Sequence, residues 1–282
     1  FRPRMAVRSE TKAVNGYTKF NTLNPKKGCE MAFFALDFDG VLCDSAAETA
    51  ASAWKCAWEL WPELLQTQQI PEEMTNKFLR VRPYLETGWQ AVLMLRMLLE
   101  KQPMDAFQNT LDVHCRRLLK SSGLDAETMI RKFAQSRDRW IREDQQDWLN
   151  SHRFYPGSSQ ALAKAMEKHE VRILTTKQER FARLLLAGQG IQFPENKIWG
   201  LEKKRAKEDL LEEFIRDGAG EIYFVEDRLE TLLRVAARPQ LAGIRLYYAL
   251  WGYGTETEQE QARQHPSITC LELTQFMQIL QA

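Results

Sequence analysis

The chain alternates between short apolar runs and segments with helical periodicity, and this alternation restricts the folds open to it. Four runs of bulky apolar residues predict buried strands, at residues 32–36, 171–174, 221–225 and 243–250. Apolar residues three or four positions apart predict helices before and between the later strands, at residues 158–168, 177–188 and 207–215. A repeated strand and helix specifies a parallel sheet covered by helices on both faces. The predicted fold class is therefore α/β.

A long helical stretch interrupts this rhythm after the first strand. Residues 45–152 show a helical pattern throughout and contain six of the eight tryptophans, which we interpret as packing anchors. A stretch of this length is too long for a simple connection between two strands. We therefore expect an inserted all-helical domain at 45–152, with hinges near Asp44 and residues 155–157. The sheet domain then comprises residues 31–44 and 153–282.

The first thirty residues differ from the rest in charge. They hold seven Lys or Arg against only Glu10 and Glu30, and they lack a periodic apolar face. Such a segment is predicted to be disordered. Two interpretations remain open: the remnant of an organelle-targeting signal, with a plastid favoured over a mitochondrion, or a basic tail of a soluble cytoplasmic protein.

Composition excludes several classes of function. The 39 basic and 38 acidic residues nearly balance and form no basic stripe, which argues against a nucleic-acid partner. The longest apolar stretch, at 91–99, is interrupted by Arg96 and is too short to span a membrane. The five cysteines form no Cys-x-x-Cys pair, and the four histidines are scattered, so neither a disulfide framework nor a zinc site is expected. A small, locally charged ligand fits better.

Two carboxylates follow the first predicted strand, in Asp37-Phe38-Asp39-Gly40-Val41. In an open parallel sheet the carboxyl ends of the strands line the ligand crevice, and Gly40 allows the backbone to leave the strand sharply. One acid can attack while the other moves protons, which is the arrangement needed to form a phosphorylated aspartate. The alternative is an acidic turn that caps the next helix.

Polar residues also follow or flank the later strands. Thr175 follows the second strand, where it either holds a phosphate oxygen or caps the next helix. A basic cluster at residues 202–207 precedes the helix that starts near Glu208, and one buried lysine there would neutralise carboxylate and phosphate charge. Glu226 and Asp227 end the third strand, and such oxygen ligands facing the first acidic pair suit magnesium.

The order of these residues along the chain resembles the motif order of the haloacid dehalogenase superfamily, and specifically of its phosphatases with a helical cap (C1-type) after the first strand. Residues 37–41 match the first motif of that family, Thr175 the second, a lysine among 203–207 the third, and residues 226–227 the fourth. Residues 155–162 and 251–254 are similar to segments of phosphoglycolate-phosphatase-like members. The likeness covers residues 31–275, and the cap matches in placement and helicity more than in residues.

The resemblance implies a Rossmann-like core and phosphoryl transfer in two steps. Asp37 would attack phosphorus, and Asp39 would protonate the leaving oxygen and later deprotonate a water. Thr175 would bind the transferred group, and a lysine, with Lys207 favoured, would connect it to Asp37. The substrate would be a small phosphorylated metabolite.

The resemblance also implies Mg²⁺ as the cofactor. Its ligands would be Asp37, the backbone carbonyl of Asp39 and Asp227, with Glu226 a direct or water-mediated neighbour. The fourth motif often carries a further acid where this chain has Thr231, which puts the metal affinity in question.

The third motif departs from the family as well. Many relatives have Lys-Pro there, whereas no proline follows any candidate lysine in this chain. We favour Lys207, because it begins the predicted helix, and keep Lys204 as the second candidate.

The sequence favours a magnesium-dependent phosphatase, with two alternatives. These are a phosphomutase of the β-phosphoglucomutase type and a catalytically silent binding module. In the helical insertion, Arg80, Arg82 and Glu86 form the most distinctive polar cluster, and Arg82 either recognises a polar or anionic leaving group or forms a surface salt bridge. The substrate and the oligomeric state cannot be read from the sequence.

Overall fold

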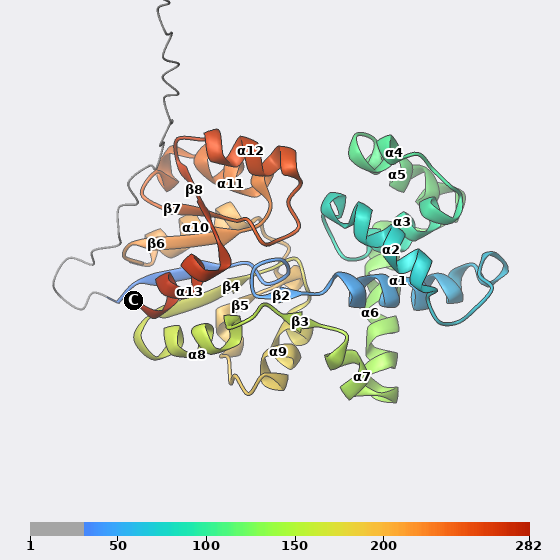
Figure 1. Cartoon of the computed structure of the whole chain (residues 1–282), viewed down its shortest axis with the longest axis horizontal. Helices are drawn as coiled ribbons and strands as arrows, with labels where there is room; N and C mark the ends of the chain where they lie inside the picture. Colours follow the sequence, from blue (N-terminus) through green and yellow to red (C-terminus); the bar gives the residue numbers. More distant parts are fainter. Residues whose placement is uncertain (1–30) are drawn as a thin grey trace, which may run out of the picture. The chain divides into compact units, whose positions relative to one another are not determined.

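The structure, a computed structural model, describes residues 31–282 (Figure 1), and Met31–Ala282 form one compact unit. The predictions made for residues 1–30, including the targeting interpretation, fall outside the described residues. In residues 31–282, no helix has the length and apolar character needed to cross a membrane.

The centre of the fold is a parallel sheet of six strands in the order β5-β4-β1-β6-β7-β8. The strands are β1 (Phe33–Leu36), β4 (Glu170–Leu174), β5 (Ile198–Trp199), β6 (Ile222–Glu226), β7 (Arg245–Ala249) and β8 (Ile268–Leu271). All four predicted strands belong to this sheet, and the short β5 and β8 add to it. The α/β, Rossmann-like fold class is therefore confirmed.

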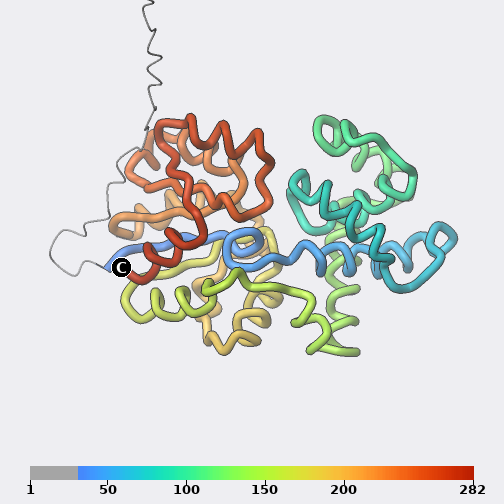
Figure 2. Tube along the Cα trace, viewed as in Figure 1, coloured from blue at the N-terminus to red at the C-terminus, as the bar shows by residue number. Residues whose placement is uncertain are grey.

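Strand β1 lies between β4 and β6, although these come from distant parts of the chain (Figure 2). Its four residues are all buried because both faces of the sheet are covered. Phe33 and Ala35 contribute to the apolar core under helices α10 (Lys207–Arg216), α11 (Leu229–Ala236) and α12 (Glu256–Gln264). Successive strand residues point to opposite faces, so Phe34 and Leu36 point to the other side of the sheet.

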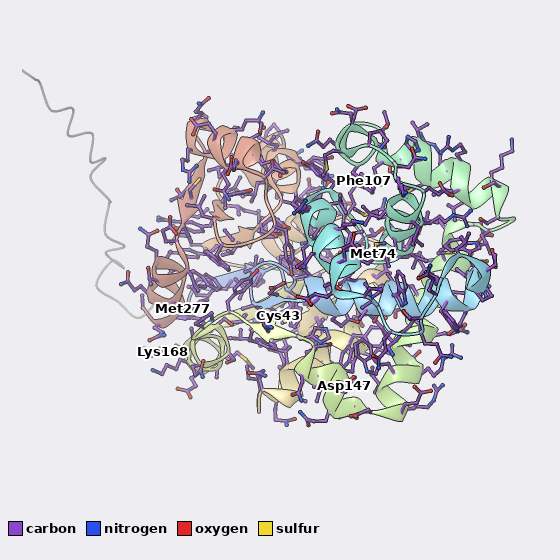
Figure 3. All side chains as sticks on the ribbon, turned by 45° about the vertical axis from the view of Figure 1, so that its right-hand side comes forward. Cys43, Met74, Phe107, Asp147, Lys168 and Met277 are labelled. Atoms are coloured by element: carbon purple, nitrogen blue, oxygen red, sulfur yellow. The ribbon has the colours of Figure 1, made fainter. Side chains whose placement is uncertain are left out.

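Three further helices complete the sheet domain. Helix α8 (Ser158–Lys168) packs against α13 (Leu273–Gln281), and α9 (Glu179–Gly188) packs against β5. Lys168 of α8 and Met277 of α13 lie near each other in Figure 3. Single turns of 3-10 helix occur at Pro62–Leu64, Arg82–Tyr84, Glu195–Lys197, Leu201–Lys203 and Pro239–Leu241.

Along the sequence, a helical segment at residues 45–152 lies between β1 and the other strands of the sheet. The chain enters it through β2 (Cys43–Asp44) and leaves it through β3 (Arg153–Phe154), and these two strands pair antiparallel. Its helices are α1 (Ala46–Leu60), α2 (Glu72–Val81), α3 (Gln90–Leu99), α4 (Met104–Gln108), α5 (Leu111–Ser121), α6 (Ala126–Glu143) and α7 (Gln145–Asn150).

The helical segment has an apolar core of its own, drawn from residues 50–133. Trp54 and Trp61 lie in this core, and Phe107, which Figure 3 labels among these helices, is 2% exposed. A separate core is what an independently packed domain requires.

Candidate active site

The site is built around the loop that leaves β1. The amide of Asp37 donates to the carbonyl of Val225 (3.0 Å), so the β1–β6 ladder continues until the acid emerges at the sheet edge. The chain then turns at Gly40, whose φ is +91°. A Cβ at this position would lie 1.9 Å from Asp227 Oδ2. Glycine is therefore required both for the turn and for the close approach to Asp227.

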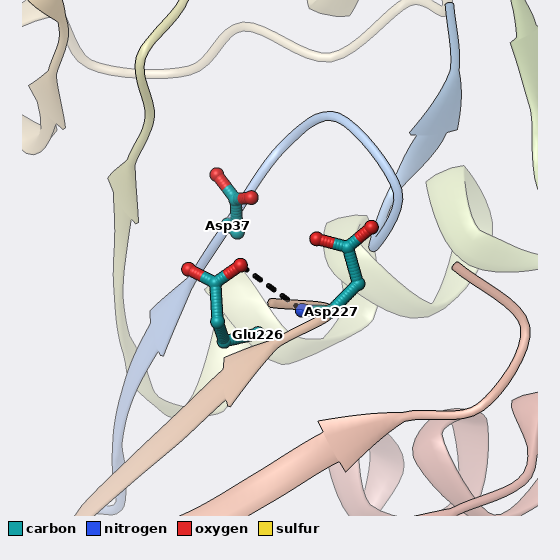
Figure 4. Close-up of side chains that lie close together, drawn as sticks. All are labelled: Asp37, Glu226 and Asp227. Carbon is teal, nitrogen blue, oxygen red and sulfur yellow. Dashed lines mark hydrogen bonds between the residues drawn. The ribbon is translucent and has the colours of Figure 1, made fainter. Parts of the chain in front are cut away.

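Three acidic side chains meet at this edge (Figure 4). Asp37, Glu226 and Asp227 each offer one oxygen, and these oxygens lie within 4.8 Å of one another. The register explains the meeting, because Leu36 of β1 is paired with Val225 of β6 and the acids follow directly. The side chain of Asp39 does not join this group, and only its backbone was implied as a magnesium ligand.

Lys207, the first residue of α10, contacts two of these acids. Its Nζ lies 2.9 Å from Asp37 Oδ1 and 2.6 Å from Glu226 Oε2. Burial acts to lower the pKa of Lys207, but Asp37 and Glu226 outweigh it and raise that pKa. The other candidate, Lys204, is exposed and ends a 3-10 turn with φ +49°. The structure thus brings Lys207 to Asp37 and leaves Lys204 in solvent.

The acids carry more negative charge than Lys207 balances. Burial and the charge of Glu226 raise the pKa of Asp37 well above its usual value, and the same two causes raise the pKa of Asp227 to about 7. Burial also acts to raise the pKa of Glu226, but Lys207 outweighs it and the pKa is lowered. Two buried carboxylates that resist ionisation are the electrostatic setting that a divalent cation relieves.

The hydrogen bonds show which oxygens remain for a cation. Both oxygens of Glu226 are engaged, since Oε2 binds Lys207 and Oε1 accepts the amides of Asp227 (3.0 Å) and Arg228 (3.1 Å). The ammonium of Lys207 contacts one oxygen of Asp37, and the amide of Tyr253 donates a hydrogen bond to one oxygen of Asp227 (2.8 Å). Each aspartate therefore retains a second oxygen, and this donor set fits Mg²⁺ with Glu226 in a supporting position.

Asp39 lies beside a lysine that sequence reasoning did not find. Its Oδ1 accepts a hydrogen bond from Ser45 Oγ (2.6 Å) and lies 3.2 Å from Lys177 Nζ. Burial acts to raise the pKa of Asp39, but Lys177 and Ser45 outweigh it and lower that pKa. The position of Lys177 was a usable signal, because it lies three residues beyond the end of β4 at the same sheet edge.

Thr175 also lies at this edge, as predicted, and is 6% exposed. Its Oγ1 accepts the amide of Lys177 (3.0 Å), which closes a tight turn. Helix α9 begins at Glu179 with Gln178 as its N-cap, so the alternative role of Thr175 as the helix cap is wrong. The hydroxyl proton of Thr175 remains available for donation.

A pocket lies between the sheet edge and the helical segment. From the sheet edge it is lined by Asp37, Asp39, Lys177, Asp227 and Tyr253, and from the helical segment by Arg82, Glu86, Trp89, Phe133 and Arg137, among others. Thr175 and Lys207 are not among the residues that line it.

Arg82 joins the two sides of the pocket. The central carbon of its guanidinium lies 3.7 Å from the centre of the Tyr253 ring, and its Nε is buried without a hydrogen-bond partner among the described residues. Close by, Arg228 Nη1 donates to the carbonyl of Leu85 (2.7 Å). Within residues 31–282 Arg82 forms no salt bridge, so the surface ion pair considered from the sequence does not form.

Behind the pocket lies a buried ionic network that the sequence did not reveal. Glu48 of α1 is fully buried and binds Arg137 of α6, the indole of Trp148 (3.2 Å) and Ser52 (2.5 Å). Glu48 and Arg137 are 89 positions apart, and no local pattern indicates their pairing. Burial lowers the pKa of the neighbouring His152 to about 4, although Glu48 opposes the shift.

The sequence matches no family model, and no curated protein matches it. Solved structures do resemble the fold. One, described as a predicted phosphoglycolate phosphatase from Haemophilus somnus, is 14% identical, has a TM-score of 0.54, and the match covers 88% of this chain and 97% of that one. A haloacid dehalogenase-like family hydrolase from Streptococcus pneumoniae is 12% identical at a TM-score of 0.51, over 89% and 99% of the two chains.

A predicted phosphatase from Clostridium acetobutylicum matches equally well, with 14% identity, a TM-score of 0.51 and coverage of 89% and 98%. Each likeness spans nearly the whole of the other chain. At such low identity, the agreement concerns the backbone fold. The chain therefore shares its backbone fold with these structures, one of which is described as haloacid dehalogenase-like, and this is the fold that the order of its motifs predicted.

Proposed function

We propose that this protein is a magnesium-dependent phosphatase that hydrolyses a small phosphate monoester through a phosphorylated Asp37. The observation that carries the proposal is the position of Lys207, whose ammonium bridges Asp37 and Glu226 at the carboxyl edge of the sheet. A nucleophilic carboxylate must approach an anionic phosphoryl group, and a fixed buried cation reduces their repulsion. The haloacid dehalogenase fold of the chain supports this assignment.

The reaction needs two displacements at phosphorus. In the first, an oxygen of Asp37 bonds to phosphorus, the bond to the leaving oxygen breaks, and Asp39 gives its proton to that oxygen. In the second, Asp39 takes a proton from water, the water oxygen bonds to phosphorus, and the bond to Asp37 breaks. Asp39 thus regains its proton, and Thr175 and Lys207 hold the transferred group between the steps.

Magnesium would be held by Asp37, Asp227 and the backbone carbonyl of Asp39, with Glu226 in support. When bound, the ion supplies positive charge that offsets both the buried carboxylates and the phosphoryl oxygens. Asp227 is oriented for this role by the amide of Tyr253.

The helical segment, residues 45–152, is proposed to act as a cap that covers the site and contacts the leaving group. Support comes from its separate core and from the pocket that it lines together with the sheet edge. Closure of a cap over the bound substrate excludes bulk water from the reaction. Arg82, with a buried and unpartnered Nε, is the candidate for binding an anionic or polar leaving group.

The test is phosphate release from a panel of phosphate monoesters, with Mg²⁺ and with EDTA. We compare the wild type with Asp37→Asn and with Asp217→Asn, which changes an exposed aspartate at the end of α10. We expect release that requires Mg²⁺ from the wild type and Asp217→Asn, and none from Asp37→Asn. Acid quenching with labelled substrate should trap phosphate on the wild type and on Asp217→Asn, and none on Asp37→Asn.

Unchanged turnover by Asp37→Asn would disprove the mechanism. Phosphate transfer between sugar positions, dependent on a bisphosphate, would indicate the phosphomutase instead. If no ester is hydrolysed or isomerised, the result would favour the catalytically silent binding module, and a binding screen would follow.

A further inference from the structure

Lys177 is buried to an unusual degree for a lysine. Its side chain is 2% exposed, and among the described residues its ammonium forms one salt bridge, with Asp39 Oδ1 at 3.2 Å. Lysine is rarely buried so fully unless its charge is paired, because an isolated buried charge is costly. The burial of Lys177 therefore depends on Asp39.

The backbone of Lys177 is fixed on both sides. Its amide donates to Thr175 Oγ1 (3.0 Å), and its carbonyl accepts the amide of Leu201 (3.1 Å). Gly200 packs so closely that a Cβ there would lie 2.7 Å from the carbonyl of Lys177. A side chain that starts from a fixed backbone and ends in a buried ion pair has little freedom to move.

Both donors to Asp39 reach the same carboxylate oxygen. Ser45 Oγ lies 2.6 Å from Oδ1, and Lys177 Nζ lies 3.2 Å from it. Ser45 lies just before α1, whereas Lys177 lies beyond β4, so the two donors approach from different elements. With Oδ1 held in this way, Oδ2 is the oxygen left to exchange a proton with a reacting group in the pocket that Asp39 lines.

We propose that Lys177 is a positioning residue for Asp39, which together with Ser45 fixes Oδ1 and presents Oδ2 to the leaving oxygen. The proposal rests on the proposed phosphatase function. Lys177 itself forms and breaks no bond. When the bond from phosphorus to the leaving oxygen breaks, the proton on Oδ2 moves to that oxygen, and the carboxylate that remains pairs with the Lys177 ammonium. Lys177 thus aligns this transfer and stabilises Asp39 after it.

The need for this proton depends on the leaving group, which makes the proposal testable. An alkoxide is a poor leaving group and requires protonation, whereas p-nitrophenolate leaves readily without it. The ratio kcat/KM reports the steps up to the first phosphoryl transfer, so it measures this dependence directly. A residue that only maintained the fold would affect both substrates alike.

The experiment measures kcat and KM for the best alkyl monoester of the panel and for p-nitrophenyl phosphate. The variants are Lys177→Met, Lys177→Arg and the control Lys164→Met, which changes an exposed lysine on α8. For Lys177→Met we expect kcat/KM to fall about 100-fold on the alkyl ester and at most about threefold on the aryl ester. Lys177→Arg should recover part of the loss, and Lys164→Met should match the wild type.

Ser45→Ala provides a second route if Lys177→Met fails to fold. It removes the other donor to Oδ1 and should show the same dependence on the leaving group, with a smaller loss. Equal losses on both substrates, or a higher KM with unchanged kcat, would overturn the positioning role while leaving the phosphatase proposal intact. Absence of turnover by the wild type on every ester would overturn both.

Discussion

Arg137 donates two hydrogen bonds of 2.7 Å to the Glu48 carboxylate, and the side chains are 6% and 0% exposed. The pair joins α6 to α1 near β2 and β3, the two strands through which the chain enters and leaves the helical segment. Burial acts to raise the pKa of Glu48, but Arg137 outweighs it and lowers that pKa strongly. A planar guanidinium bound at two points fixes orientation as well as distance.

Removing either partner of this pair should destabilise the protein. Glu48→Gln or Arg137→Met should lower the free energy of unfolding by about 3–5 kcal/mol, because the remaining charge is buried without a partner. The double variant should lose less than the sum of the two. Urea denaturation measures each value.

Glu59 and Arg139 form a matched pair between the same helices at 37% and 46% exposure, and Glu59→Gln should lower the free energy of unfolding by less than about 1 kcal/mol. Equal losses for the two pairs would contradict this account.

Stability should fall as the pH is lowered from about 6.5 to about 4. Burial lowers the pKa of His152 from 6.5 to about 4, so over this interval the unfolded chain binds a proton that the folded chain does not. The difference corresponds to about 3 kcal/mol of unfolding free energy.

At pH values below the usual pKa of a carboxyl group, protonation of Glu48 removes further stability, because its pKa is lowered in the folded state. His152→Gln should flatten the upper part of the profile, while His265→Gln, which changes a partly exposed histidine, should not. A profile unchanged in His152→Gln would exclude this cause.

A methyl group at Gly252 should impair metal binding. A Cβ there would lie 2.3 Å from Asp227 Cβ and 2.7 Å from the carbonyl of Gly40, so Gly252→Ala must displace the carboxylate. We expect the Mg²⁺ concentration for half-maximal activity to rise about tenfold or more, as when other supports of a metal ligand are lost. Gly243→Ala is the control, because a Cβ there meets open space. Direct titration of Mg²⁺ by calorimetry separates lost binding from lost turnover, and wild-type affinity in Gly252→Ala would refute the prediction.

The two lysine candidates should differ sharply. Lys207→Met leaves Asp37, Glu226 and Asp227 buried without a cation, so kcat should fall about 100-fold or more. The midpoint of thermal unfolding should fall too, in the absence of Mg²⁺. Lys204→Met changes an exposed side chain and should alter the free energy of unfolding by less than about 0.5 kcal/mol. Steady-state kinetics and thermal unfolding of both variants decide the assignment, and loss of activity in Lys204→Met alone would reverse it.

Arg82→Ala should weaken binding of substrates with an anionic leaving group. A hydrogen bond to a charged group contributes about 1.5–3 kcal/mol, so KM for such a substrate should rise about tenfold or more. KM for p-nitrophenyl phosphate, whose leaving group has no anionic substituent, should change little. Arg80→Ala, two positions away on the exposed side of α2, serves as the control. Unchanged KM values for both substrates in Arg82→Ala would remove Arg82 from leaving-group recognition.

Local patterns were sufficient for much of the fold. The apolar runs that became β1, β4, β6 and β7 are readable because a strand covered on both faces consists mostly of apolar residues. The positions of Asp37, Thr175, Glu226 and Asp227 were predicted to share one edge, because parallel strands end together. The short strands β5 and β8 were not predicted, since β5 has only two residues and the apolar run of β8 is interrupted by Thr269.

The sequence by itself determined which residues end each strand, and so which acids meet at the sheet edge. The sequence favoured Lys207 as the partner of Asp37, but only the tertiary structure decided between Lys207 and Lys204. It alone paired Lys177 with Asp39 and Arg137 with Glu48. The physical reason is that strand formation follows from the periodicity of neighbouring residues, whereas a buried ion pair joins residues from separate elements. Its partners are set by how those elements pack, and sequence spacing alone does not identify them.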